Sequence, residues 1–366
     1  MKTLFIIPAL SRLWGGTTVA VLNSFYALRA QGADIELWSA RRDDDEISDD
    51  VAQDTKIRFF DSYTSWRYSP NLKRALELEL KNFDIVHIHG MWLYPHLMAA
   101  KLAKKMGVPY IISPHGMIEA DALARKGLKK RVYWTLLEKT NFQNASAIHA
   151  ITENEAAQTA ALAPSKQTFI IPNGIETLPH NPKAAFPKEP TILFVGRLHP
   201  IKGLDRLIRA VALLNARLIV AGDGDVEYKK YIYDLTNELG VNDKVEFLGF
   251  VGKEQKRNLY AEASFICVPS HSEVLSLVAL EAISCGLPVV ISKACYFDDI
   301  KTHGAGMVIE DNDPSTIKDG IERMLLSDLE AMSQNAFELS QKYSLSSMAD
   351  KMLSEYGKIS RLQRNK

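Results

Sequence analysis

Short apolar runs alternate along the chain with longer segments in which apolar residues recur every three or four positions. The short runs are rich in isoleucine, valine and phenylalanine, which is typical of buried strands, and the longer segments have the period of amphipathic helices. This alternation predicts repeated strand–helix–strand units, and therefore parallel sheets covered by helices. An α/β fold is expected for the whole chain.

The predicted elements form two series, separated by a stretch between Asn173 and Pro190 that holds four prolines and no apolar period. In the first series strands are expected at residues 3–7, 35–39, 57–60, 85–89, 110–113, 147–151 and 168–171, and helices at 17–30, 71–81, 95–106 and 129–141. In the second series strands are expected at 191–195, 217–221, 245–249, 265–268, 288–291 and 307–309, and helices at 203–214, 226–239, 253–261, 277–285 and 314–326. Because the alternation of strands and helices begins anew after the proline-rich stretch, two doubly wound domains are predicted, 1–175 and 191–344, joined by a linker at 176–190. A final amphipathic helix is predicted within 345–366.

Composition is that of an ordinary globular protein, with 366 residues, 46% of them apolar. Basic and acidic residues each number 44, so no global positive field favours nucleic acid as a partner. Cys267, Cys285 and Cys295 lack metal-ligand spacing and are expected to be buried thiols in a reducing compartment. No uncharged apolar run approaches about 18 residues and no signal-like segment opens the chain, so a cytoplasmic protein is expected.

Glu273 and Glu281, with seven residues between them, lie where the strand at 265–268 passes through a polar loop into an apolar helix. Glu273 is expected on the loop and Glu281 about two turns into the helix. The unpaired N–H groups and positive dipole end of that helix suit a phosphate, so one carboxylate could hold a sugar beyond it and the other a ribose before it. The alternative is two solvated glutamates, but Glu281 lies among apolar residues, where a carboxylate needs a partner.

Two cations flank a turn after the strand at 191–195, in the segment Gly196-Arg197 to Lys202-Gly203. Both could reach a diphosphate, Arg197 through the paired N–H donors of its planar guanidinium and Lys202 through the compact charge of its ammonium group. The alternative is a pair of surface cations. Gly222 belongs to a Gly-x-Gly turn that is by itself a weak nucleotide signal, because no third glycine follows at the right place.

These motifs resemble the retaining glycosyltransferases of the GT-B fold, specifically the large family 4, which uses nucleotide-activated sugars. The resemblance rests on Glu273-x7-Glu281, the following Ala-x-x-x-Gly-x-Pro-Val-Val and the segment at 196–203, and it extends over residues 3–356. It implies two Rossmann-like domains that face each other across a cleft, with the final helix crossing back to the first domain.

The resemblance also implies roles for individual residues. Arg197 and Lys202 are expected to bind the donor phosphates and stabilise the departing nucleoside diphosphate, Glu273 to hold the transferred sugar and Glu281 the ribose. The remaining donor contacts are assigned to Gly222, Phe250, Val251, Val274, Leu275, Ser276 and Leu277. Many relatives have Glu-Gly-Phe-Gly where this chain has Glu273-Val274-Leu275-Ser276, a departure that bears on the identity of the sugar.

No metal or other cofactor is expected, because Arg197 and Lys202 supply the positive charge that a metal-dependent GT-A enzyme obtains through an Asp-x-Asp motif. The nearest imitation, Asp43-Asp44-Asp45, is expected to lie in a solvated, charged loop.

On the acceptor side, Gly15 and Gly16 follow the first strand and lead into a helix, so their amides could meet the β-phosphate or the sugar. An ordinary glycine turn is the alternative. His115, which follows another strand, is the candidate to hydrogen-bond the transferred sugar or the acceptor hydroxyl. His87 and His89 end a strand too, and one is expected to face the core and the other the loops.

Five cations at residues 125–131 lie among aromatic and apolar neighbours. A solvated helix face is the alternative to an interfacial patch on anionic lipid, where each cation is worth roughly 1 kcal/mol. Tyr63, Trp66 and Tyr68 form a second sugar-stacking or interfacial candidate.

The sequence therefore predicts a metal-independent retaining glycosyltransferase that moves a hexose or N-acetylhexosamine, with a UDP-sugar favoured over GDP-mannose. The expected acceptor is a glycan or a polyprenyl-diphosphate-linked glycan of surface polysaccharide or O-antigen assembly, at the inner face of the cytoplasmic membrane. The alternatives are an epimerase or hydrolase of the same fold and a non-catalytic nucleotide-binding partner. The complete set of Arg197, Lys202, Glu273 and Glu281 argues against the last.

Overall fold

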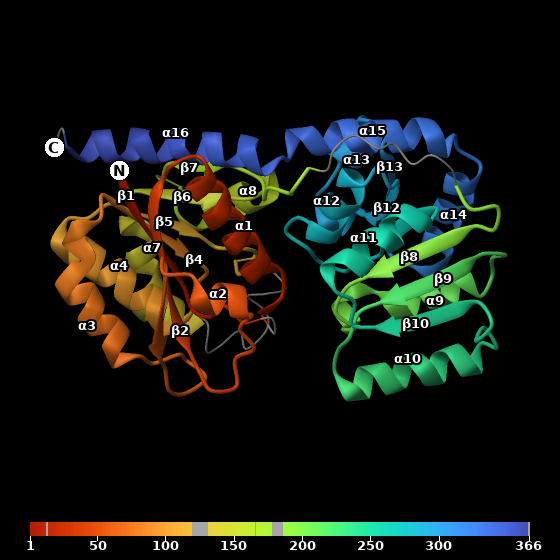
Figure 1. Cartoon of the computed structure of the whole chain (residues 1–366), viewed down its shortest axis with the longest axis horizontal. Helices are drawn as coiled ribbons and strands as arrows, with labels where there is room; N and C mark the ends of the chain where they lie inside the picture. The colour runs from red at the N-terminus through yellow and green to blue at the C-terminus, as the bar shows by residue number, and fades with distance from the viewer. Residues whose placement is uncertain (12–13, 119–130, 165, 178–185, 365–366) are drawn as a thin grey trace. The chain divides into compact units, whose positions relative to one another are not determined.

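A computed structural model of the chain describes residues 1–11, 14–118, 131–164, 166–177 and 186–364 (Figure 1). They form two compact units: Met1–Gly174 together with Leu345–Lys366, and Ile175–Ser344. The first unit is thus built from both ends of the chain, and the second unit from the segment between them. Residues 178–185 of the expected linker lie outside the described residues.

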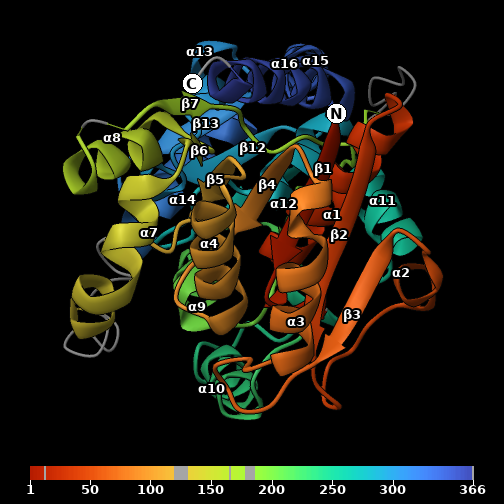
Figure 2. The same cartoon turned by 90° about the vertical axis from the view of Figure 1, so that its left-hand side faces the viewer.

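The first unit contains a parallel seven-stranded sheet of order β3-β2-β1-β4-β5-β6-β7 (Figure 2). Its strands are β1 (Lys2–Ile7), β2 (Asp34–Arg41), β3 (Ile57–Asp61), β4 (Ile85–His89), β5 (Tyr110–Ser113), β6 (Ala147–Ala150) and β7 (Thr168–Ile170). Its helices are α1 (Gly16–Ala30), α2 (Asp49–Gln53), α3 (Pro70–Glu79), α4 (Tyr94–Met106), α7 (Lys139–Asn144), α8 (Glu153–Leu162) and α16 (Leu345–Arg364). A 3-10 turn, η2 (Leu80–Asn82), and a π-helical turn, η3 (Trp134–Glu138), complete it.

Alternate residues of the strands supply a separate apolar core on each face of this sheet, because successive side chains of a strand point to opposite sides. Leu4 and Ile6 belong to a core that includes residues of α3 and α4, whereas Phe5 and Ile7 belong to one that includes α1 and α16. The α16 residues in that core follow helical spacing and are Met348, Ala349, Met352, Tyr356 and Ile359. Burial of this stripe explains why the last helix belongs to the first unit.

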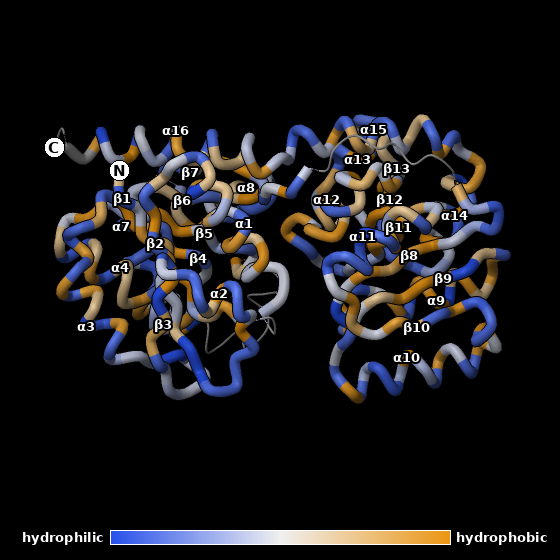
Figure 3. The backbone as a smooth tube through the Cα atoms, viewed as in Figure 1, coloured by the Kyte–Doolittle hydropathy of each residue, from blue (hydrophilic) through white to orange (hydrophobic). Residues whose placement is uncertain are grey.

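The second unit contains a parallel six-stranded sheet of order β10-β9-β8-β11-β12-β13. Its strands are β8 (Thr191–Val195), β9 (Arg217–Ala221), β10 (Val245–Gly249), β11 (Phe265–Val268), β12 (Val289–Ser292) and β13 (Gly306–Ile309). Its helices are α9 (Leu204–Val211), α10 (Val226–Glu238), α11 (Lys253–Glu262), α12 (Leu277–Ser284), α13 (Asp299–Thr302), α14 (Pro314–Leu325) and α15 (Leu329–Lys342), with 3-10 turns η4 (Pro200–Lys202) and η5 (Lys293–Cys295). In both units the most hydrophobic backbone segments include the strands (Figure 3).

The predicted α/β class, with two doubly wound parallel sheets, is confirmed. In each sheet the strand order reverses beside the first strand of the unit, between β1 and β4 and between β8 and β11. Ligands of such sheets bind beyond the carboxyl ends of the strands at this reversal, so the loops that follow these strands define where a site is sought.

Candidate active site

The loop after β8 is held between the loops that follow β9 and β11 by very close backbone contacts. Gly203 has φ 69° and lies so close to Pro269 that an added Cβ would be 2.1 Å from the Pro269 carbonyl oxygen. Gly222 would place a Cβ 1.8 Å from the carbonyl oxygen of Gly196. Only glycine permits such approaches, so these two positions determine how the candidate phosphate-binding residues come together.

Lys202 and Glu273 are the two predicted site residues that the structure brings into direct contact. The Lys202 Nζ lies 2.5 Å from Glu273 Oε1, which also accepts a hydrogen bond from the Ser270 hydroxyl at 3.1 Å. Both side chains are partly exposed, at 25% and 16%. The pair places one cation and one carboxylate at the carboxyl ends of β8 and β11, where a ligand can reach both.

The backbone between Glu273 and α12 is available to an anion. Ser276 caps α12, and its hydroxyl accepts the Ala279 N–H at 3.3 Å. Within the described part of the chain, the N–H groups of residues 274–277 have no hydrogen-bond partner. Arg197 is exposed and likewise has no partner among the described residues. These groups supply positive charge and N–H donors beside Lys202.

Glu281 is the fifth residue of α12, about one turn from the start of the helix, so the predicted distance of two turns is wrong. Its carboxylate accepts hydrogen bonds from Lys256 Nζ at 2.7 Å and from the Tyr260 hydroxyl at 2.8 Å. Both partners lie on α11, four residues apart and therefore on one face. This pairing explains how a carboxylate is tolerated in an apolar helix.

The segment expected to contact the base follows β10. Phe250 is 70% exposed and Val251 is buried. A large aromatic side chain so exposed at the carboxyl end of a strand is available to stack on a ligand ring.

In the first unit, the candidate residues Gly15 and Gly16 begin α1. Gly15 is the N-cap, with φ 65°, and its lack of a side chain leaves the first N–H groups of α1 uncapped by that residue. Such a helix start can bind an anion.

His115 lies on the loop after β5 in a left-handed conformation, φ 52°, and Gly116 follows with φ 76°. The fully buried Glu155 accepts the Gly116 N–H at 2.7 Å, and the Trp92 indole donates to the Met117 carbonyl at 3.2 Å. Non-glycine residues seldom adopt positive φ, and those that do are frequent at functional sites. Burial, with His149 and His96 nearby, lowers the pKa of His115 to about 3, so the ring is neutral at pH 7.

Four buried groups of the first unit form a separate relay of hydrogen bonds, which does not include His115. His149 Nε2 must donate to the Ile171 carbonyl at 2.8 Å, so its Nδ1 accepts from the Ser113 hydroxyl at 2.7 Å. The Ser113 oxygen then accepts from His87 Nε2 at 2.6 Å, and His87 Nδ1 accepts from the Tyr356 hydroxyl of α16 at 2.6 Å. Burial lowers the pKa of both histidines and raises that of Tyr356, so the relay is uncharged.

The expectation that one of His87 and His89 faces the loops is wrong. Both are buried, at 0% and 2% exposure, and their ring centroids lie 4.1 Å apart. Residues two apart on a strand share a face, so an opposite placement was excluded by the pleat itself.

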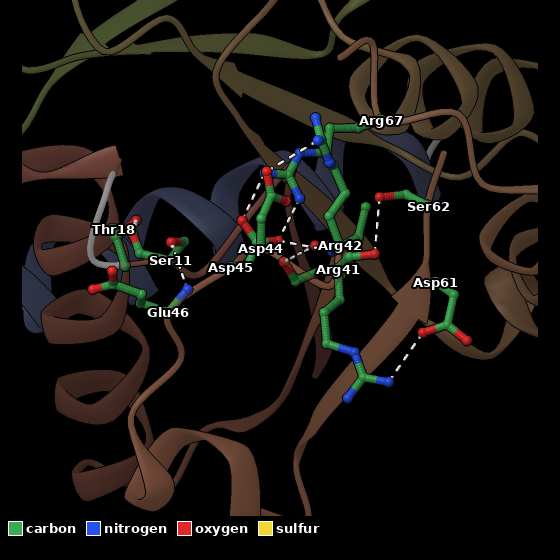
Figure 4. A network of polar contacts seen from close by, with 12 residues as sticks. Ser11, Thr18, Arg41, Arg42, Asp44, Asp45, Glu46, Asp61, Ser62 and Arg67 are labelled. Atoms are coloured by element: carbon green, nitrogen blue, oxygen red, sulfur yellow. Dashed lines mark hydrogen bonds and ion pairs between the residues drawn. The ribbon is translucent and has the colours of Figure 1, made fainter. Parts of the chain in front are cut away.

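The expectation for Asp43-Asp44-Asp45 is wrong for its last member. Asp43 and Asp44 are exposed, but the Asp45 side chain is 3% exposed and forms a two-fold ion pair with buried Arg67, one contact at 2.7 Å (Figure 4). Asp45 also accepts the Arg42 N–H at 2.8 Å, and the Asp45 pKa is lowered because the Arg67 and Arg42 hydrogen bonds outweigh burial. Among the described residues no three His, Cys, Asp or Glu side chains are grouped as a metal site requires.

Of the aromatic candidates, Tyr63 and Tyr68 are exposed at 58% and 43%, whereas the Trp66 indole donates to the Trp92 carbonyl at 3.2 Å and has a structural role. Of the basic stretch 125–131, only Arg131 is described, and it is exposed.

None of the described helices combines the length and the apolar character needed to cross a membrane. The three cysteines are free thiols, of which Cys267 and Cys295 are buried and Cys285 is half-buried.

Comparison with known proteins gives the family. Residues 177–339 match the model of the glycosyl transferases group 1, and residues 15–174 match that of the glycosyl transferase 4-like domain. An uncharacterised glycosyltransferase of Methanocaldococcus jannaschii is 31% identical over 274 residues, which cover 68% of this chain and 67% of that protein. The chain belongs to the glycosyltransferases.

Two solved structures agree with the GT-B fold of this glycosyltransferase. Anabaena HepE in complex with UDP-glucose superposes with a TM-score of 0.78 at 17% identity, over 98% of this chain and 100% of HepE. WaaG, a glycosyltransferase involved in lipopolysaccharide biosynthesis, gives a TM-score of 0.70 at 18% identity, over 96% of this chain and 98% of WaaG.

Sequence reasoning missed several residues that hold the candidate site of the glycosyltransferase in place. Lys256 and Tyr260 were not singled out, although their spacing of four on a predicted helix could have suggested a shared partner. Glu155 was missed together with α8, although Thr152-x-x-Glu155 is a helix-capping signature. Glu138 carries no such signal, because its burial depends on tertiary packing against Trp92.

Proposed function

We propose that this glycosyltransferase moves a hexose or N-acetylhexosamine, with retention of configuration, from a nucleoside-diphosphate sugar to a glycan or polyprenyl-diphosphate-linked acceptor. A UDP-sugar is favoured over GDP-mannose as the donor. The observation that carries the proposal is the Lys202–Glu273 contact beside the free N–H groups of residues 274–277. A cation and backbone donors suit the diphosphate, and the adjacent carboxylate suits the hydroxyls of a sugar attached to it. The UDP-glucose bound by HepE supports the choice of donor class.

In the proposed reaction the acceptor hydroxyl attacks the anomeric carbon on the face from which the diphosphate leaves. The bond between that carbon and the phosphate oxygen breaks, the new glycosidic bond forms, and the hydroxyl proton passes to the departing phosphate. Lys202, Arg197 and the start of α12 stabilise the negative charge that develops on the phosphate, so no metal is required. Glu273 then orients the sugar and is not a covalent nucleophile.

Surface polysaccharide or O-antigen assembly at the inner face of the cytoplasmic membrane is the proposed setting. The role of WaaG in lipopolysaccharide biosynthesis supports it by analogy of fold. The first described residues after the basic stretch also support it, because Val132 and Leu136 are 51% and 71% exposed beside the exposed Arg131. Apolar and cationic side chains together favour an anionic lipid surface.

A thermal-shift screen of UDP, GDP and their sugars, in the presence of EDTA, tests the donor assignment. Stabilisation by a nucleoside-diphosphate sugar in EDTA is expected, and a strict requirement for Mg²⁺ or Mn²⁺ in transfer would contradict the site as described. The anomeric configuration of the product, read by NMR, tests retention. Release of free sugar as the sole product, with every acceptor tried, would instead favour a hydrolase.

A further inference from the structure

His89 and His115 form a hydrogen bond that has a direction, and the direction determines what His115 offers to a ligand. We infer that His89 is a positioning residue that keeps the proton of His115 on Nδ1, so that His115 presents an N–H donor and not a base. The inference deepens the proposed function, but only its kinetic test rests on that function. The state of the rings can be measured without any substrate.

The two rings are brought together by the ends of neighbouring strands. His89 pairs with Ser113 in the register of β4 and β5, and the Gly90 N–H continues the ladder to the Ser113 carbonyl at 2.8 Å. The left-handed turn at His115 then directs its ring back toward β4, where His115 Nε2 lies 3.0 Å from His89 Nδ1. Glu155 holds this turn through the Gly116 N–H.

Both rings are neutral, so one nitrogen of the pair must donate and the other must accept. Burial lowers the pKa of His89 well below its usual value, and the neighbouring His87, His115, His149 and His96 lower it further. A neutral histidine carries one proton, so the role of His89 Nδ1 also decides the state of His89 Nε2.

The surroundings of His89 Nε2 decide the direction. This atom is buried and has no hydrogen-bond partner among the described residues. If His115 Nε2 donated, His89 would carry its proton on Nε2, as a buried N–H without an acceptor. If His89 Nδ1 donates, only an unused lone pair remains on Nε2. Buried N–H groups without an acceptor are rarer in proteins than buried acceptors without a donor, so the second arrangement is favoured.

His115 therefore accepts at Nε2 and carries its proton on Nδ1. A ring in this state donates to an oxygen, either a hydroxyl of a sugar or an oxygen of a phosphate, and does not take a proton from it. This agrees with the proposed reaction, in which the departing phosphate takes the acceptor proton. His87 and His149 carry their protons on Nε2, so His115 and His89 are expected to form a distinct pair among the histidines of the first unit.

The ring nitrogens of the nine histidines can be observed by long-range ¹H–¹⁵N NMR of the full chain at pH 7.5. Loss of one set of signals in His115→Asn assigns His115, and His303→Asn, at an exposed position of the second unit, is the matched control. We expect His115 to show a protonated Nδ1 and a bare Nε2. A protonated Nε2 on His115 would overturn the inference.

Two variants then test the role of His89. His89→Asn keeps an N–H donor close to the position of Nδ1 and should preserve the His115 signals, whereas His89→Leu removes the donor and should shift them. Unchanged signals in folded His89→Leu would show that His89 does not position His115. If that variant does not fold, the unmodified protein and His89→Asn still decide.

The kinetic test uses turnover of UDP-glucose as the probe. His89→Leu should lower turnover by roughly tenfold, because His115 then no longer presents its N–H donor to the ligand. His89→Asn should lower turnover by less than about twofold, because it keeps a donor to His115 Nε2. If the NMR result is as expected but His115→Asn and His89→Leu turn over UDP-glucose like the unmodified protein, the tautomer stands and the place of His115 in the proposed function is refuted.

Discussion

Lys202 already has a partner before any ligand arrives, because Glu273 lies 2.5 Å from its ammonium group. A bound diphosphate must share or displace that contact. In Glu273→Gln the competing charge is gone, so bare UDP should bind up to about fivefold more tightly, the range of a partly exposed ion pair. Sugar transfer should fall by on the order of 10²-fold, because the sugar loses a well-aimed acceptor.

Calorimetry with UDP and product analysis measure the two effects separately. Glu246→Gln is the control, because Glu246 forms an exposed ion pair with Arg217 at 3.0 Å in the same unit. Weaker binding of bare UDP to Glu273→Gln would contradict the placement of this carboxylate beyond the phosphates.

Glu281 should behave in the opposite way. Its carboxylate is held by Lys256 and Tyr260, and the proposed role is to accept the hydroxyls of the ribose. Glu281→Gln should therefore weaken UDP and UDP-glucose by similar factors, about tenfold, since both contain the ribose. Calorimetry with both ligands is the measurement. An effect confined to UDP-glucose would show that Glu281 acts on the sugar instead.

At the scale of elements, the turn η3 contains a buried acid that responds to pH. Glu138 is 2% exposed and accepts the N–H of Trp92, whose φ is 75°. Burial raises the pKa of Glu138 from its usual 4.5 to about 7, and the Trp92 hydrogen bond and the charge of Lys101 oppose this rise with smaller effects. The hydroxyl groups of Tyr110 and Tyr133 also interact with the Glu138 carboxyl group. Between the two pKa values of Glu138 the folded state holds a proton that the unfolded state has lost, so the contribution of Glu138 to stability is greatest below about pH 4.5 and is lost as pH rises through about 7.

This predicts a loss of roughly 3 kcal/mol of folding free energy in the first unit between about pH 4.5 and pH 8 from Glu138 alone. Glu138→Gln keeps an oxygen for the Trp92 N–H and should remove most of this slope, so that the variant is more stable at pH 8. All five tryptophans belong to the first unit, so their fluorescence during urea unfolding at several pH values reports on this unit. Exposed Glu153, changed to Gln, is the control. An unchanged slope in Glu138→Gln would show that another group causes it.

The elements show what sequence patterns can and cannot predict. Strands were predicted almost to the residue, because a strand buried on both faces is an unbroken apolar run bounded by polar loops. The helices α8 and α15 were missed, since alanine, glutamine and serine interrupt their apolar period. The burial of Glu138 in the π-helical turn could not be predicted, because its partner, the Trp92 N–H, is 46 residues away in sequence.

The same distinction applies to the candidate site. Lys202 and Glu273 could be proposed from sequence because each follows an apolar strand, and adjacent parallel strands end at one edge. The partners of Glu281 and the histidine relay could not, because they join segments that only the folded chain brings together. Tyr356 and His87 are 269 residues apart.

For the whole molecule, the two units are expected to differ in their dependence on the chain ends. A chain that stops at Ser344 lacks α16, which supplies buried Met352, Tyr356 and Ile359 to the first unit. The tryptophan fluorescence of this chain should show no cooperative unfolding, whereas UDP binding should persist because the proposed donor residues of Ile175–Ser344 remain. Tyr356→Phe, which only leaves His87 Nδ1 without its donor, should cost about 1–3 kcal/mol and keep cooperative unfolding. Cooperative unfolding of the tryptophans in the truncated chain would refute this dependence.

Because α16 is synthesised after the whole second unit, the order of synthesis and the order of assembly differ in this protein. Domains generally fold as units and the first to be synthesised folds first, but here the core on one face of the first sheet, which α1 also contributes to, lacks the apolar stripe of α16 until the second unit has been made. During that interval an apolar strip of the nascent chain is open to chaperones. The first unit therefore completes its native core only after the second unit has been synthesised.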